Sequence, residues 1–166
     1  CGIAGHSLGG ALALKTASRS DRVTCVLTSS AVGASFPLNS ALDGFWTLPD
    51  TSGALKDSMM KMVGNPAALT NEMIDQRWEL LQTADYAEYF GEMFAPPRQQ
   101  YLDAAVLSPE ELANISAKIV MLHGRDDQPC PAQETTMALS WSLRDADIHL
   151  LGNCGHNLPR ERSNDY

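Results

Sequence analysis

The sequence has no long apolar run and little basic charge. None of its hydrophobic stretches approaches the roughly 20 residues that a helix needs to cross a bilayer, so we expect no membrane-spanning segment. Its 12 lysines and arginines are dispersed and outnumbered by 20 aspartates and glutamates, which gives a net charge of -8. Because binding to a phosphate backbone depends on clustered basic side chains, we also expect no nucleic-acid partner.

Cysteine is scarce, and close pairs of cysteines are absent. The chain has four, namely Cys1, Cys25, Cys130 and Cys154. This spacing lacks the clustering of a zinc site, and the density is too low for a disulfide scaffold. The first residues also lack the basic stretch and cleavage site of a secretory signal. We therefore expect a cytoplasmic protein that needs no metal and no other cofactor.

The length of 166 residues and an apolar content of 44% suit one globular domain with a packed core. The first residue is Cys rather than Met, and it falls inside an apolar segment. The last residues fall within what reads as the start of a further helix. We therefore expect the sequence to be truncated at both ends.

Strand-like and helix-like segments alternate in both terminal parts of the chain. An apolar segment at residues 1–4, a helix at 11–17 and a β-branched strand at 23–28 form a strand–helix–strand unit. After residue 108 the alternation resumes, with expected elements at 109–114, 118–122, 132–143 and 147–151. Such units favour a parallel sheet with helices on both faces.

Between these two parts the sequence has a helical rather than an alternating pattern. Met, Leu, Trp and Tyr recur at helical spacing with no β-branched run, which predicts helices at 52–63, 70–83 and 86–94. We therefore divide the chain into a first core part (1–35), an all-helical insertion (36–107) and a second core part (108–166).

The segment Gly5-His6-Ser7-Leu8-Gly9 matches the nucleophile-elbow pattern G-x-S-x-G, and it lies between an apolar segment and a helix as that pattern requires. A serine there sits in a strained turn with its oxygen above the sheet edge, and glycines let the chain pass close by. The N–H of Leu8, at the start of the helix, is free to stabilise an oxyanion. We therefore predict that Ser7 is a nucleophile.

A serine nucleophile needs a base, and that base needs an orienting carboxylate. Asp126 and Asp127 follow the strand at 118–122, and His156 lies in a glycine-flanked loop after the strand at 147–151. All three positions follow carboxyl ends of parallel strands, where open α/β sheets assemble their sites. The order Ser, Asp, His is that of α/β-hydrolases. Residue pattern alone leaves the choice between the two aspartates open. We interpret the remaining histidines as packed or surface side chains, namely His6, His123 and His149.

Several segments together resemble the meta-cleavage product hydrolases of bacterial aromatic degradation, which include 2-hydroxymuconic semialdehyde hydrolases. The resemblance covers essentially the whole chain and rests, beyond the elbow, on residues 30–36, 76–79, 93–99, 123–127 and 154–156. It implies an α/β-hydrolase fold, with a doubly wound and mostly parallel sheet, and it implies that the helical insertion is a lid.

The resemblance also implies roles for single residues. It makes Asp127 the acid that supports His156, and Arg77 the lid residue that holds the carboxylate end of the substrate, for which a bidentate guanidinium is chemically suited. His6 and Trp78 are further candidates for substrate binding, and packing within the lid is an alternative role for Trp78. The chain departs from the family pattern in having His6 where many members have Asn, and Asn157 where many have Trp.

From this resemblance we expect a hydrolase that cleaves a carbon–carbon bond in a 2-hydroxy-6-oxo-dienoate, giving 2-hydroxypentadienoate and a small carboxylic acid. The expected partner is a small-molecule carboxylate, and the pattern leaves a homo-oligomer open. One alternative is a carboxylesterase or lactonase with the same three residues. A second is a non-catalytic homologue that binds a ligand.

Overall fold

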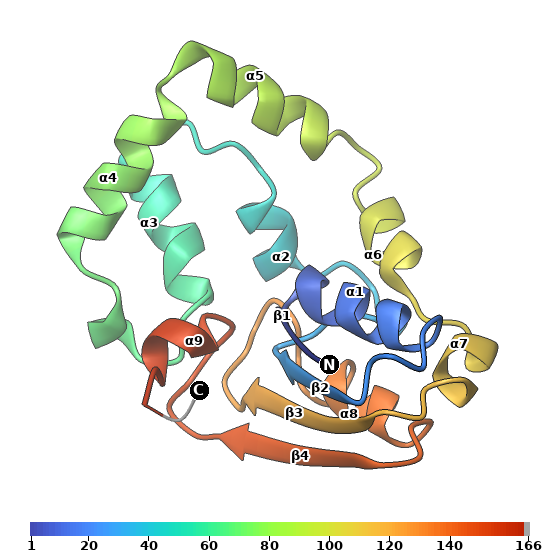
Figure 1. Cartoon of the computed structure of the whole chain (residues 1–166). Coiled ribbons are helices and arrows are strands. Elements are labelled where there is room, and N and C mark those ends of the chain that lie inside the picture. The colour runs from blue at the N-terminus through green and yellow to red at the C-terminus, as the bar shows by residue number, and fades with distance from the viewer. Residues whose placement is uncertain (165–166) are drawn as a thin grey trace.

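A four-stranded parallel sheet is the centre of the structure, a computed structural model in which residues 1–164 are described. Its strands lie side by side in chain order: β1 (Gly2–His6), β2 (Cys25–Ser29), β3 (Lys118–Gly124) and β4 (Ala146–Leu151). Each neighbouring pair is parallel, so all four strands end at one edge of the sheet (Figure 1). The predicted parallel sheet is confirmed, and the segments after its strands meet at this edge.

Helix α1 (Leu8–Ala17) covers one face of the sheet. Its alanines and Leu14 pack on that face with α7 (Pro109–Ala113) and α8 (Thr136–Ser140) nearby, and the shared core includes Val26, Ile119 and Met121. The prediction of a helix over 132–143 is correct only for its central part. Residues 132–135 form turns instead, where the Thr135 hydroxyl donates to the Pro131 carbonyl.

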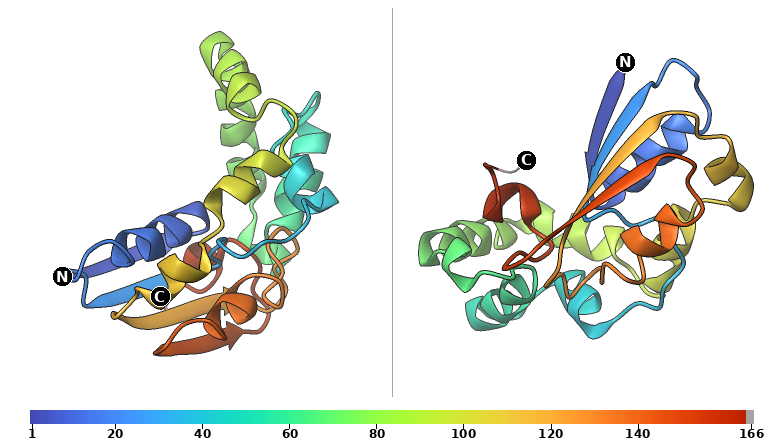
Figure 2. Two further views of the ribbon diagram at one scale, coloured as in Figure 1. Left: turned by 90° about the vertical axis from the view of Figure 1, so that its right-hand side faces the viewer. Right: turned by 90° about the horizontal axis from the view of Figure 1, so that it is seen from below.

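The opposite face of the sheet is largely bare within the described residues. Leu27 and Val120 line a shallow apolar depression of about 420 Å³ there, beside the exposed Ala4. Among residues 1–164, only those at the carboxyl end cover this face, where α9 (Leu158–Glu161) brings Leu158 against Leu122. Figure 2 shows the contrast, with helices gathered on one side of the strands.

Residues between β2 and β3 form a layer of short helices beyond the carboxyl edge. These are α2 (Ser40–Phe45), α3 (Ser52–Lys61), a 3₁₀ turn (Pro66–Ala68), α4 (Asn71–Leu81), α5 (Ala84–Met93) and α6 (Gln99–Ala105). The predicted helices at 52–63, 70–83 and 86–94 are confirmed as α3, α4 and α5. The arrowheads of β2, β3 and β4 point toward α3 and α9 (Figure 1). The boundaries at residues 35 and 107 stay a prediction.

Side chains from three of these helices form a small core of their own. Leu55 of α3 packs with Ile74 and Leu81 of α4, and Tyr86 of α5 lies against this cluster. The longest helix of the layer, α4, has 11 residues. Nowhere in residues 1–164 does a helix have the length and apolarity needed to span a membrane.

Candidate active site

Ser7 lies in the sharp turn between β1 and α1, with backbone angles φ 53° and ψ -121°. A non-glycine residue in this region stores of order 1–3 kcal/mol of strain, and such strain clusters at functional sites. A Cβ on Gly5 would lie 2.1 Å from the Gly9 carbonyl oxygen, and one on Gly10 would lie 2.5 Å from the Ala31 Cβ. A Cβ on Gly9 would meet nothing within 4 Å, so close packing explains Gly5 and Gly10 but not Gly9.

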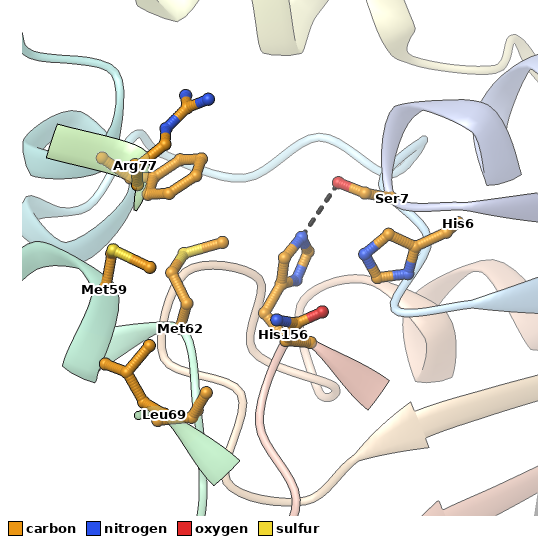
Figure 3. A pocket seen from close by; sticks show the side chains of 10 residues that line it. His6, Ser7, Met59, Met62, Leu69, Arg77 and His156 are labelled. Atoms are coloured by element: carbon orange, nitrogen blue, oxygen red, sulfur yellow. Dashed lines mark hydrogen bonds between the residues drawn. The ribbon is translucent and has the colours of Figure 1, made fainter. Parts of the chain in front are cut away.

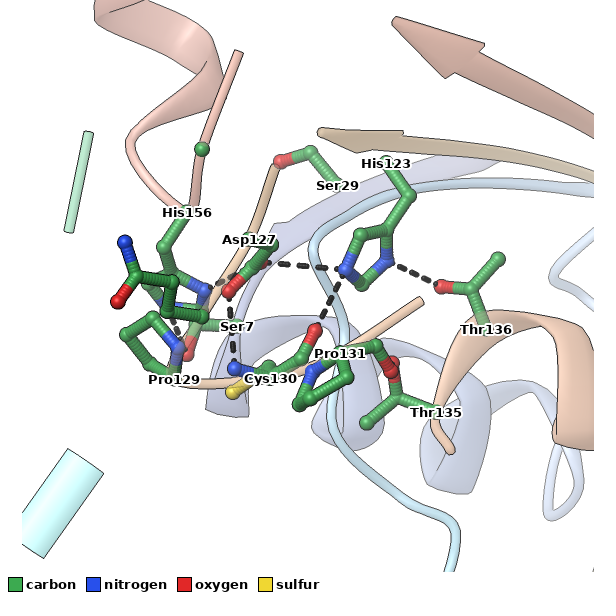
Figure 4. Close-up of polar contacts among 12 residues, drawn as sticks. Ser7, Ser29, His123, Asp127, Pro129, Cys130, Pro131, Thr135, Thr136 and His156 are labelled. Carbon is green, nitrogen blue, oxygen red and sulfur yellow. Dashed lines mark hydrogen bonds and ion pairs between the residues drawn. The ribbon is translucent and has the colours of Figure 1, made fainter. Parts of the chain in front are cut away.

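Three side chains from distant segments form one hydrogen-bonded chain at the carboxyl edge. The Ser7 Oγ lies 3.0 Å from the His156 Nε2, and the His156 Nδ1 lies 2.9 Å from an Asp127 oxygen (Figure 4). The imidazole and the carboxylate are buried. The structure thus brings together the residues that the sequence proposed as nucleophile, base and acid, and their geometry permits a proton to pass from the serine to the histidine.

The Asp127 carboxylate is held by three donors. Its Oδ1 accepts the Cys130 N–H at 2.8 Å, and its Oδ2 faces the His156 Nδ1 and, at 3.1 Å, the His123 Nε2. Burial alone would raise the pKa of Asp127, but hydrogen bonds from His123 and His156 outweigh it and lower this pKa to about 2. The carboxylate is therefore ionised at any physiological pH and can stabilise a positive charge on His156.

His123 is the supporting residue that the sequence interpretation missed. Its ring is fully buried, with Nδ1 2.7 Å from the Thr136 hydroxyl and Nε2 2.8 Å from the Cys130 carbonyl. The carbonyl and the carboxylate both call for a proton on Nε2, and in a neutral imidazole Nδ1 would then accept from the Thr136 hydroxyl. The alternation in β3 could have revealed it, because position 123 shares a face with Ile119 and Met121 and a polar residue there needs buried partners.

Asp126 has a different role from its neighbour. Its side chain is 42% exposed, its backbone N–H donates to the Cys154 carbonyl at 2.9 Å, and its Oδ2 accepts the Cys154 N–H at 3.3 Å. Asp126 therefore holds the loop that carries His156 without contacting the imidazole. The geometry favours Asp127 as the partner of His156.

One possible metal-binding group overlaps this site. The side chains of Asp127, Cys130 and His156 bring three potential ligand atoms within 4.8 Å of one another. The oxygens of Asp127 already accept hydrogen bonds from the other two residues. Burial, followed by the charge of Asp127, raises the pKa of the Cys130 thiol well above its ordinary value, and a thiol is a poor ligand. We therefore interpret the group as support for the aspartate.

His6 is a second imidazole beside the serine. Its Nδ1 lies 3.0 Å from the Ser29 hydroxyl, and its ring centroid lies 5.1 Å from that of His156. Burial, followed by the nearby His156, lowers the pKa of His6 to about 4, so the ring is neutral at pH 7. His6 lines the cavity described next, but whether it contacts a substrate stays a prediction.

The Ser7 and His156 side chains open into a cavity with two lobes. One lobe, of about 360 Å³, includes Arg77 and is otherwise mostly apolar; we call it the arginine lobe. The other, of about 300 Å³, includes Trp46, Phe94 and Tyr101; we call it the aromatic lobe. Ser7, His156, Phe45 and Met62 belong to both lobes, so the serine lies at their junction.

Arg77 extends from α4 into its lobe and lies across the cavity from Ser7 (Figure 3). Its guanidinium carbon is 5.4 Å from the centroid of the Tyr86 ring, and within residues 1–164 no carboxylate oxygen lies within 4.0 Å of its nitrogens.

Two other predicted site residues lie elsewhere. The Trp78 side chain packs on the small core of α3 and α4. Leu8 is the first residue of α1, so helix geometry gives its N–H no intrahelical partner.

The fold and the site together define a class. A parallel sheet with crossover helices carries a strained serine after one strand, an aspartate after another and a histidine after the last, which is the arrangement of an α/β-hydrolase. The chain belongs to the alpha/beta hydrolase family, whose family profile matches residues 2–165.

Two curated relatives are similar to this chain in sequence over nearly its whole length. The chain is 31% identical over 162 residues to a 2-hydroxy-6-oxo-2,4-heptadienoate hydrolase of Pseudomonas putida, and 28% identical over 155 residues to a 2-hydroxymuconate semialdehyde hydrolase of the same species. These matches cover 97% and 93% of the chain but only 58% and 55% of the relatives. The chain therefore spans little more than half the length of the curated relatives that it matches.

A solved structure shows the same similarity to meta-cleavage product hydrolases. The meta-cleavage product hydrolase CumD from Pseudomonas fluorescens, as a variant complexed with acetates, superposes with a TM-score of 0.91 at 28% identity. The match covers 99% of this chain and 61% of that one. The resemblance to meta-cleavage product hydrolases that the sequence suggested is thus supported by both relatives and structure.

Proposed function

We propose that this chain carries the catalytic triad of a hydrolase that cleaves a carbon–carbon bond in 2-hydroxy-6-oxo-dienoates, the products of meta ring fission of aromatic compounds. One observation carries the proposal: the hydrogen-bonded chain Ser7–His156–Asp127 opens into a cavity with a single guanidinium on the opposite wall. The relatives and the solved structure described above are named as hydrolases of such compounds.

The two lobes suggest how the substrate lies. Its carboxylate would pair with Arg77, whose guanidinium has no carboxylate partner among residues 1–164, and its conjugated chain would lie along the apolar wall of Met59 and Met62. The carbonyl that is attacked would then sit beside Ser7 at the junction of the lobes. The substituent on that carbonyl would enter the aromatic lobe, whose Trp46, Phe94 and Tyr101 favour an apolar group.

The chemistry follows from these positions. Once proton shifts have converted the dienol to its keto form, the Nε2 of His156 accepts the proton of Ser7, or of a water in its place, and the freed oxygen attacks the carbonyl. The Leu8 N–H stabilises the negative oxygen that develops. The bond to the neighbouring carbon then breaks, its electron pair passes into the dienolate, and His156 returns the proton. By the serine route the acyl group stays on Ser7 as an ester, and a water that His156 deprotonates cleaves this ester, which frees Ser7 and supplies an oxygen of the carboxylic acid. By the water route the acid forms directly.

The helices α2–α6 would act as the lid of this site. They supply most of the apolar wall and the guanidinium, while the sheet edge supplies the reacting groups. We further propose a cytoplasmic setting, which the free thiols of all four cysteines support.

The test is a substrate panel for the full-length gene product. A ring-fission dienoate, its methyl ester and a p-nitrophenyl ester are compared by kcat/KM. We expect the free dienoate to be cleaved most efficiently and its methyl ester to lose about 10–100-fold, as for loss of a charge-assisted pair. A preference for the p-nitrophenyl ester would instead show an ordinary esterase. Ser7→Ala should remove turnover. If the wild type instead binds the dienoate without cleaving it, and Ser7→Ala binds it equally well, the protein is a binding protein.

A further inference from the structure

The loop that carries His156 and the turn that follows α3 touch through their backbones at Gly155 and Gly64. A Cβ on Gly155 would lie 2.5 Å from the Gly64 nitrogen, and a Cβ on Gly64 would lie 2.5 Å from the Cys154 carbonyl carbon. The two glycines therefore allow a contact that side chains would prevent. Just beyond it, the Asn157 N–H donates to the Met62 carbonyl at 3.1 Å.

One side chain bridges this contact. Glu161, the last residue of α9, accepts the N–H groups of Gly64 and Asn65 on its Oε2, both at 2.8 Å, and the N–H of Gly155 on its Oε1 at 2.9 Å. These are short bonds from backbone donors to a carboxylate, a type about twice as strong as a neutral pair. Both oxygens of Glu161 are thereby committed to the two segments.

The two segments are the ones that matter for the site. Residues on either side of His156 are fixed to the turn after α3, Gly155 through Glu161 and Asn157 through Met62. That turn also supplies Met62 and Val63 to the wall of the arginine lobe. Asp126 also holds the loop of His156, but the Glu161 carboxylate is the side chain that bonds to this loop and to the turn of the cavity wall at once.

We propose that Glu161 is a positioning residue that holds His156 at hydrogen-bonding distance from Ser7 by joining its loop to the turn that forms the cavity wall. The proposal rests on the triad assigned above. It does not depend on which substrate the triad attacks. The Glu161 carboxylate accepts hydrogen bonds from the main chain of Gly64, Asn65 and Gly155, none of which lines the cavity, so we expect it to act through the backbone that it holds.

The test uses a probe that reads the triad without the substrate. A fluorophosphonate reacts with a serine that an imidazole activates, so its labelling rate at Ser7 reports the Ser7–His156 geometry. In the full-length gene product, Glu161→Gln keeps the size of the side chain but replaces one acceptor oxygen by an NH₂ group that faces an N–H donor. Because a misplacement of about 1 Å costs roughly 100-fold, we expect labelling to slow by about 10–100-fold.

Controls separate positioning from general stability. Glu134→Gln, at an exposed glutamate before α8, should label at the wild-type rate. Hydrogen exchange should speed up in residues 62–65 and 154–157 of the Glu161→Gln variant, while the variant stays folded at the assay temperature. If Glu161→Gln does not fold, Glu161→Asp, which keeps the charge but is one methylene shorter, takes its place with the same expected slowing.

The outcomes are distinct. Wild-type labelling rates in a folded Glu161 variant would overturn the proposal, most clearly if exchange at residues 62–65 had increased. A wild-type protein that labels rapidly but cleaves no dienoate would refute the proposed substrate and leave the role of Glu161 intact. A wild-type protein that does not label at Ser7 would overturn the triad and this inference with it.

Discussion

The carboxyl edge of the sheet and the helical layer above it contribute to the same cavity in different ways. At the edge, Asp127 and His156 are buried and their polar atoms are engaged in hydrogen bonds. In the layer, Arg77 is only partly buried and meets no carboxylate within residues 1–164, and Met59 and Met62 are flexible apolar side chains. Proton transfer requires fixed distances, whereas recognition requires space and an unpaired charge.

Among the residues that support Ser7, the largest effect should come from the acid at the edge. Asp127→Asn should lower kcat by about 10⁴-fold, because an amide cannot stabilise the imidazolium and favours the wrong tautomer of His156. Asp126→Asn is the matched control and should cost less than about tenfold, since an amide oxygen can still accept the Cys154 N–H. Steady-state kinetics on both variants measures these losses of kcat. A greater loss for Asp126→Asn would make Asp126, not Asp127, the acid that supports His156.

The layer should respond through binding. Arg77→Met removes the guanidinium with little change in volume, and we expect KM for the dienoate to rise by about 10–100-fold with kcat within a few-fold. Arg144→Met, at an exposed arginine before β4, should leave both constants unchanged. A loss confined to kcat would place Arg77 among the reacting groups and would remove the distinction between edge and layer.

His123 tests how far the fixed edge extends. His123→Gln can keep a donor toward Asp127, whereas His123→Leu cannot and also leaves the Cys130 carbonyl and the Thr136 hydroxyl without their partner. We expect kcat to fall by about tenfold in the Leu variant and by less in the Gln variant, in proportion to one charged hydrogen bond. Equal rates in both variants would limit the fixed edge to Asp127 and His156.

The last effect concerns acid stability rather than turnover. The pKa of Asp127 in the folded protein, about 2, lies below its ordinary value of 3.8, so the ionised carboxylate stabilises the fold. This contribution, of order 2 kcal/mol, is present in full above about pH 4 and is lost as the pH falls through about 2. Urea unfolding of the wild type and Asp127→Asn should therefore show a difference in free energy that narrows on acidification, and a constant difference would contradict the shift.

Sequence reasoning anticipated the parallel sheet, Ser7 and His156 from local patterns, whereas the choice of Asp127 over Asp126 rested on the family resemblance. β-Branched strands alternate with helices, and Ser7, Asp127 and His156 each follow a strand, so parallel topology alone brings them to one edge. Arg77 was anticipated through family resemblance, since a partly exposed arginine on a helix has no signal of its own. Whether it binds a substrate is still a prediction.

What the sequence did not reveal depends on contacts between distant segments. His123 bonds to the Asp127 carboxylate and the Cys130 carbonyl, and Glu161 bonds to backbone N–H groups of two other segments, so the partners of both residues become visible only in the fold. Helices α2 and α6 were not predicted individually, because six or seven residues give too short a pattern. The helix predicted over 132–143 covers only Thr136–Ser140 in the structure, and its first residue, Thr136, bonds to His123.

Three glycines from separate segments meet where the histidine loop is held. A Cβ on Gly124 would lie 2.1 Å from the Gly155 oxygen, and Gly155 in turn touches Gly64. No single replacement at these positions can be accommodated by moving a side chain, since the obstacle in each case is main chain. Adaptation to new substrates should therefore proceed through Phe45, Met59 and similar wall positions, and a saturation library would show these tolerant sites surrounding a trio that admits no other amino acid.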